Sequence, residues 1–157
     1  MNHIFRILTP LWLLCLLSCL TACNHKVFFS DTQSVDEQGW QYDQPLTFDV
    51  SINDTTQFYD IFIDLRNSVR YPYSNTFLFI TTTFPDTSVA KDTLECPLAD
   101  PSGQWYGKNS GRYVDNRSYF RRKTRFPIPG TYHFQISHGM REKSIDGIKN
   151  IGLRFEK

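Results

Sequence analysis

The chain has 157 residues, with 17 lysines and arginines against 16 aspartates and glutamates, and 15% of its residues are aromatic. This length suits one domain, or one domain behind a targeting segment. A net charge of +1 lacks the basic excess of a nucleic-acid-binding protein, so we expect no nucleic-acid partner. A hydrophobic fraction of 40% with 21% charged residues excludes a chain that is disordered throughout.

The first 22 residues predict a lipoprotein signal peptide. Arg6 supplies a short positive start, and residues 7–20 form an apolar run too short to span a bilayer. The run ends in Leu20-Thr21-Ala22-Cys23, which resembles a bacterial lipobox, where a diacylglyceryl group is placed on the cysteine thiol before cleavage. We therefore expect lipidation at Cys23 and stable anchoring to a membrane by two or three acyl chains. The alternative is an ordinary secretory signal that happens to contain cysteines.

The mature chain is expected to begin with a tether. Residues 24–44 are polar and show no sustained periodicity, apart from a candidate short strand at 27–29. We therefore divide the chain into a signal peptide (1–22), a lipidated N-terminus and tether (23–44) and a folded domain (45–157). If Cys23 carries lipid, Cys96 has no disulfide partner in the mature chain.

Alternation of apolar and polar residues with period two, the pattern of a half-buried strand, begins at Leu46. It predicts strands at residues 46–52, 59–65, 77–84, 89–94, 113–126, 131–136 and 151–155. The first two strands are expected to form a hairpin, residues 97–111 a long loop, and residues 140–148 a helical turn. About eight short strands predict an all-β domain, an antiparallel β-sandwich resembling a jelly roll.

The sequence offers weak candidates for catalysis or metal binding. Asp60 and Asp64 would lie about 13 Å apart on one strand, too far for the paired carboxylates of a glycosidase. His133 and His138, five residues apart on a strand, would point to opposite faces, which opposes a shared metal ion. Cys96 is better explained as a small packed residue than as a nucleophile. We expect no enzyme activity, no cofactor and no metal.

Two patches are candidates for contact with a partner. Arg121, Lys123 and Arg125 would share one face of a strand, which suits lipid headgroups, an anionic glycan or an acidic protein. A solvated strand edge, protected from pairing by its charge, explains these residues equally well. Trp105 and Tyr106 lie between glycines and suit a glycan-stacking platform, a protein-contact anchor, or a cap on the end of the sandwich.

Several segments carry a family resemblance: YPYSN at residues 71–75, GQWYG at 103–107, FPIPGTY at 126–132, HGMR at 138–141 and IGLR at 151–154. Together they resemble the gliding-motility lipoprotein family GldH over nearly the whole chain, lipobox included. The resemblance implies a non-catalytic envelope lipoprotein of Bacteroidetes-type bacteria that supports gliding or the associated secretion machinery through an envelope protein partner. It also implies anchoring to the outer membrane on the periplasmic side. A glycan-binding envelope lipoprotein is the alternative.

Lipidation at Cys23 is directly testable against the neighbouring Cys19. Residues 16–19 form a poorer lipobox, because bulky Leu17 stands before Ser18 and the apolar run is truncated. Palmitate labelling of the protein in cells should disappear with Cys23→Ala and persist with Cys19→Ala. The reverse result would move the cleavage site to residue 19.

Overall fold

The computed structural model describes residues 26–157, so the signal peptide and Cys23 lie outside the described residues. All regular structure in this part of the chain is β. The strands are β1 (Val27–Ser34), β2 (Trp40–Gln41), β3 (Leu46–Ile52), β4 (Phe58–Ser68), β5 (Asn75–Thr83), β6 (Val89–Pro97), β7 (Lys108–Asn109), β8 (Tyr113–Arg125), β9 (Gly130–His138), β10 (Ser144–Ile145) and β11 (Ile148–Glu156). Residues 26–157 contain no helix long and apolar enough to cross a membrane.

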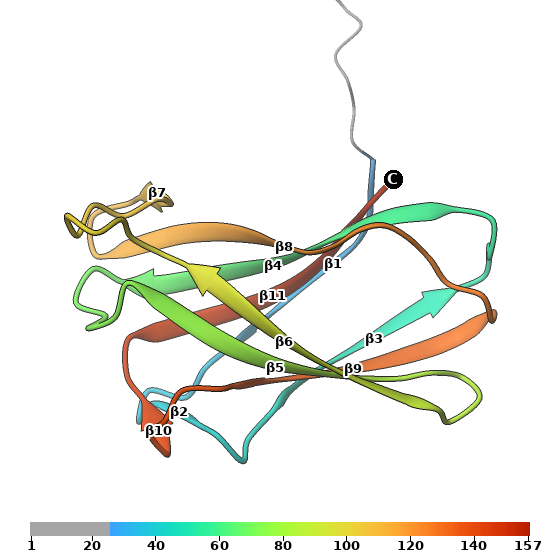
Figure 1. Cartoon of the computed structure of the whole chain (residues 1–157), viewed down its shortest axis with the longest axis horizontal. Helices are drawn as coiled ribbons and strands as arrows, with labels where there is room; N and C mark the ends of the chain where they lie inside the picture. The colour runs from blue at the N-terminus through green and yellow to red at the C-terminus, as the bar shows by residue number, and fades with distance from the viewer. Residues whose placement is uncertain (1–25) are drawn as a thin grey trace, which may run out of the picture.

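Two antiparallel sheets form the body of the domain (Figure 1). The five-stranded sheet has the order β1-β11-β4-β8-β7, and the four-stranded sheet has the order β3-β9-β5-β6. A short β10-β2 pair closes one end, where Ile145 lies opposite Trp40. The all-β class predicted from the sequence is confirmed, and the layers form a sandwich.

The core consists of the inward-facing side chains of both sheets. Along β4, Tyr59, Ile61, Ile63 and Leu65 are all buried, as their period-two spacing predicts. Phe155 of β11 lies at the centre of an aromatic cluster, whose ring centroids lie 5.7–6.0 Å from its own. The cluster partners of Phe155 are Phe29, Tyr59, Phe126 and Phe134. Because these rings come from both layers, aromatic packing joins the two sheets.

Two local predictions are wrong. Strands β3 and β4 do not form a hairpin, because β3 pairs with β9 and β4 pairs with β8 and β11. The turn between them instead carries the chain from one sheet to the other, so both apolar faces meet across the core. Residues 140–148 form bends and β10 rather than a helical turn. Gly147 has φ +94°, a conformation that ends any helical path there.

The expected tether over residues 23–44 is also corrected, because β1 is part of the five-stranded sheet. Seven residue pairs join β1 to β11, from Val27 opposite Glu156 to Ser34 opposite Asn150. Most side chains of this edge strand are exposed, so no hydrophobic alternation marks it in the sequence. Trp40, a little further on, is buried in the core. The folded domain therefore begins at Lys26, and only residues 24 and 25 lie between it and Cys23.

The buried face of β4 can be tested at Ile63, which is fully buried in the core. We expect Ile63→Ala to lower the free energy of unfolding by about 2–5 kcal/mol, through lost burial and the cavity it leaves. Urea unfolding of the mature chain measures the effect. Val69→Ala, at an exposed turn, is the matched control and should change stability by less than about 0.5 kcal/mol. An equally small effect at Ile63 would contradict this assignment of the core.

Candidate functional site

The outer face of the five-stranded sheet gathers charged side chains from three strands. Pairing of β4 with β8 places Asp64 opposite Arg117 and Arg66 opposite Asp115. Strand β11 pairs with β4 on its other side, and its outward residues Arg154 and Glu156 contribute two further charges. We call this surface the charged face; it consists of Asp64, Arg66, Asp115, Arg117, Arg154 and Glu156.

The charges on this face are paired with one another. Arg66 donates two hydrogen bonds to Asp115, at 2.6 and 3.1 Å, and Arg117 donates two to Asp64, at 2.6 and 3.2 Å. The hydrogen bonds from Arg66 lower the pKa of the Asp115 carboxyl. Since these pairs are largely exposed, each contributes less than about 1 kcal/mol to stability. They fix the positions of these side chains more than they stabilise the fold.

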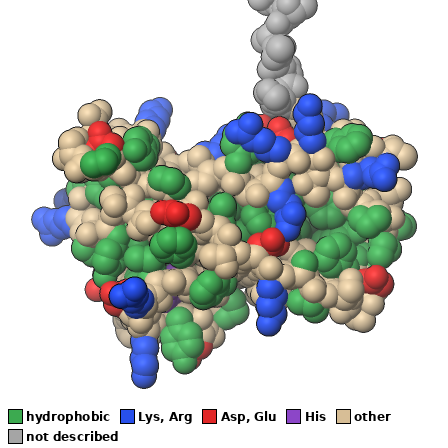
Figure 2. Space-filling view, in the orientation of Figure 1, with side chains coloured by type: hydrophobic (Ala, Val, Ile, Leu, Met, Phe, Trp, Pro, Cys, Tyr) green, Lys and Arg blue, Asp and Glu red, His purple; other side chains and the backbone are tan. Residues whose placement is uncertain are grey.

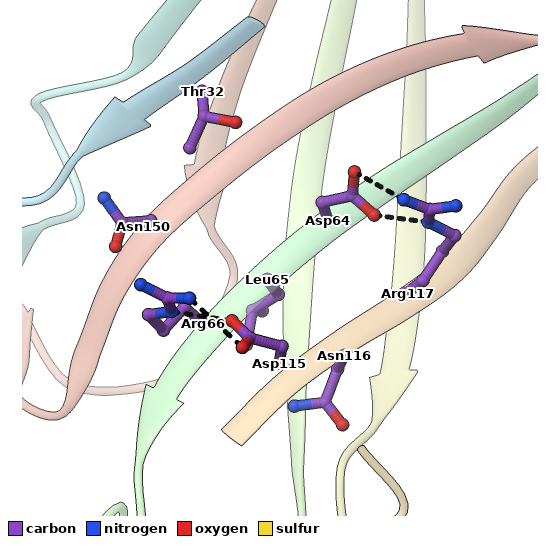
Figure 3. Close-up of a pocket in the computed structure, with 8 residues that line it drawn as sticks. All are labelled: Thr32, Asp64, Leu65, Arg66, Asp115, Asn116, Arg117 and Asn150. Carbon is purple, nitrogen blue, oxygen red and sulfur yellow. Dashed lines mark hydrogen bonds and ion pairs between the residues drawn. The ribbon is translucent and has the colours of Figure 1, made fainter. Parts of the chain in front are cut away.

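A hollow lies in the middle of the charged face. Its volume is about 560 Å³, and Figure 3 shows the two arginine–aspartate pairs along it. It is lined by Thr32, Asp64, Leu65, Arg66, Asp115, Asn116, Arg117 and Asn150. Gly152 lies between Thr32 and Asp64 in the register of the three strands. A Cβ at residue 152 would lie 2.8 Å from Thr32 Oγ1 and 3.3 Å from Asp64 Cβ, so a side chain there would narrow the hollow.

Aromatic rings continue the charged face along β8. The rings of Phe62 and Tyr119 lie 4.4 Å apart between centroids. The guanidinium carbon of Arg122 lies 3.8 Å from the centroid of Tyr119, and that of Arg117 lies 5.4 Å from the centroid of Phe62. Tyr119 is 45% exposed, so this stacked group is accessible to a partner.

The structure separates the two patches that the sequence suggested. Trp105 pairs with Ala99 in an isolated bridge and packs against the core, whereas Tyr106 is 63% exposed. This loop ends beside the first residues of β8, because Lys108 lies opposite Asp115. Lys123 lies eight residues further along β8, about 25 Å away at the rise of a strand. Tyr106 therefore borders the charged face, and the basic residues lie at the other end of the domain.

The basic residues of β8 do not present one regular face. The register with β4 shifts twice around Ile61, and Lys123 has a positive φ of 45°. Three consecutive residues from 121 to 123 are exposed as a result. Arg121 is bound by Asp92 of β6 at 2.7 Å, so it closes the edge of the sandwich. Lys123 and Arg125 remain exposed at the end of the strand.

The residues considered for catalysis or metal binding do not come together in one site. Cys96 is fully buried, and burial raises the pKa of its thiol to about 11, which disfavours the thiolate. His133 is exposed and lies 2.6 Å from Asp49 Oδ1, whereas His138 is buried on the opposite face of β9. Asp60 accepts a hydrogen bond from the backbone N–H of Lys123. Within residues 26–157, no group of three or more histidines, cysteines or carboxylates is arranged to hold a metal ion.

The sequence analysis considered Asp60 and Asp64 only as a catalytic pair and did not identify the charged face. The alternation of β4 could have indicated it, because Asp64 and Arg66 share the face opposite the core. The arrangement nevertheless depends on the pairing of β4 with both β8 and β11, which local patterns do not specify.

A family model and two relatives of known name all point to the same lipoprotein family. The family model of the GldH lipoprotein matches residues 27–155. The chain is 31% identical over 144 residues to a "Gliding motility lipoprotein GldH homolog" of Christiangramia forsetii, covering 87% of this chain and 88% of the relative. It is 30% identical over 145 residues to the "Gliding motility lipoprotein GldH" of Flavobacterium johnsoniae, covering 88% and 89%.

Buried His138 predicts a pH dependence of stability. Burial lowers the pKa of His138 in the folded chain below the ordinary value of about 6.5. At a pH between these two pKa values, the histidine is protonated in the unfolded chain but neutral in the folded one. Stability should therefore fall as the pH drops below about 6.5, by at most about 1.4 kcal/mol per pH unit. Thermal unfolding from pH 7.5 to 5 should show a smaller loss for His138→Gln than for the unchanged chain. His133→Gln, at the exposed histidine, is the control; parallel curves for all three proteins would contradict the assignment.

Proposed function

The chain belongs to the GldH lipoprotein family, and from this membership we propose that it supports gliding motility or the associated secretion machinery as a non-catalytic envelope protein. It is a lipoprotein and is therefore held at a membrane of the cell envelope. The family match over residues 27–155 is the observation that carries the proposal. The names of the two relatives describe lipoproteins of gliding motility.

We propose that the anchor is Cys23 and that the domain lies on the periplasmic side of the outer membrane. The lipobox at residues 20–23 supports the anchor. The start of the fold at Lys26 supports a domain held close to the membrane surface, because so few residues remain as a spacer.

A non-catalytic envelope lipoprotein would act by binding a partner protein. We propose that the contact surface is the charged face together with Tyr106, which borders it. Tyrosine and arginine contribute most of the energy at many protein interfaces, and both are exposed here. Fixed arginine–aspartate pairs offer donors and acceptors in a defined pattern, which favours one partner over others. Trp105 contributes by holding the loop against the core rather than by direct contact.

The proposal is tested by deleting the gene in its own host and returning variants of it. Deletion should reduce surface spreading or the level of secreted proteins, and the unchanged gene should restore both. Tyr106→Ala should restore them poorly, because an interface tyrosine can contribute about 2 kcal/mol, or roughly thirtyfold in affinity. Tyr42→Ala, which removes a similarly exposed tyrosine elsewhere, is the matched control and should restore both fully. Membrane levels of each variant must be equal.

The outcomes separate the hypotheses. Normal spreading and secretion after deletion would contradict the proposed role. Full restoration by Tyr106→Ala would place the contact surface elsewhere. Loss of binding to an envelope polysaccharide, with protein co-purification unchanged, would favour the glycan-binding alternative.

A further inference from the structure

One end of the five-stranded sheet lies where the chain enters the domain. The N–H of Lys157 donates to the carbonyl of Lys26 at 2.9 Å, so the first and last described residues are adjacent. The same end holds the start of β4 and the end of β8, because Phe58 lies opposite Arg125. We call this surface the entry end; it consists of Lys26, Phe28, Phe58, Lys123, Arg125 and Lys157.

The entry end carries a group of exposed cations. Lys26, Lys123, Arg125 and Lys157 are all exposed, and none of them is ion-paired within residues 26–157. Figure 2 shows Lys and Arg side chains gathered around the point where the chain leaves the described domain. These four residues come from positions up to 131 residues apart (157 − 26), so only the fold brings them together.

Three carboxylates lie close to these cations: Asp54, Asp60 and Glu156. Glu156 binds Arg154 at 2.6 Å, and Asp60 accepts the N–H of Lys123 at 2.8 Å. Asp54 lies within electrostatic range of Lys157 and accepts hydrogen bonds from Thr56. Four exposed cations and Arg154 thus face three carboxylates, so the entry end keeps a positive excess.

Aromatic side chains accompany the cations. Phe58 is 53% exposed and Phe28 is 36% exposed, so two aromatic rings of the entry end are open to solvent. The ammonium group of Lys157 lies 4.9 Å from the centroid of Phe28. Exposed aromatic rings beside lysine and arginine are the combination that enters the headgroup region of a bilayer.

We propose that the entry end is a membrane-docking surface for anionic phospholipid headgroups in the same membrane that holds the lipid anchor. The inference rests on the anchor at Cys23 proposed above. Three residue steps join Cys23 to Lys26, a reach of about 11 Å, so this end of the domain cannot move far from the bilayer. Each basic residue near an anionic surface strengthens adsorption by about fivefold, and the short spacer removes most of the entropic cost.

The experiment uses the mature lipidated protein in two kinds of vesicle, phosphatidylcholine alone and phosphatidylcholine with added phosphatidylglycerol. Flotation with both kinds establishes anchoring. Lysine acetylation by a water-soluble reagent, read by mass spectrometry, then reports which lysines the bilayer covers. Lys26, Lys123 and Lys157 should react at least about threefold more slowly on the anionic vesicles, and high salt should remove the difference. Lys108 and Lys143, exposed at the opposite end, should react equally on both.

A matched pair of variants sharpens the result. Lys123→Gln with Arg125→Gln should restore most of the reactivity of Lys26 and Lys157, and Lys108→Gln with Lys143→Gln should change nothing. Equal reactivity of the entry-end lysines on both vesicles would overturn the docking surface, as would protection of Lys108 and Lys143 instead. Failure of the anchor has another signature: the protein then floats with neither vesicle, and the docking proposal, which depends on the anchor, falls with it.

Discussion

Backbone hydrogen bonding between β1 and β11 determines where the folded domain begins. It adds an edge strand to the five-stranded sheet and covers one side of β11, whose Phe155 joins the aromatic cluster of the core. It also moves the start of the fold from the expected residue 45 to Lys26. The segment between Cys23 and the fold shortens from about twenty residues to two, which supports the proposal of a domain held close to its membrane.

The two ends of β8 then have different roles. The end of the strand lies at the entry end with Lys123 and Arg125, close to the chain that leads to Cys23. The start of the strand lies beside the loop of Tyr106 and the charged face. A strand of 13 residues separates the two ends by roughly 40 Å at the usual rise. A bilayer can therefore occupy the entry end while Tyr106 and the Arg66–Asp115 part of the charged face stay free for a protein.

The sequence was sufficient for features that depend on local patterning. Period two predicted the core face of β4 through Ile63, and it placed strands where the structure has β5 and β6. Sequence patterns did not predict the features that depend on pairing between strands far apart in the chain. An exposed edge strand such as β1 carries no hydrophobic signal, and the turn after Ile52 does not specify whether the chain returns in the same sheet. The charged face and the entry end were missed for the same reason, because each joins residues from strands far apart in the sequence.

The bulges of β8 connect these observations in physical terms. A regular edge strand at residues 117–125 would invite pairing with another chain. The register shifts near Ile61 and the positive φ of Lys123 interrupt that edge, and Arg121 binds Asp92 of β6 in the other sheet. The remaining cations, Lys123 and Arg125, project at the end of the strand. The same irregularity thus prevents edge pairing and concentrates positive charge at the entry end. The solvated edge and the proposed lipid contact, which were alternative interpretations of the basic residues, are therefore compatible with the same distortion.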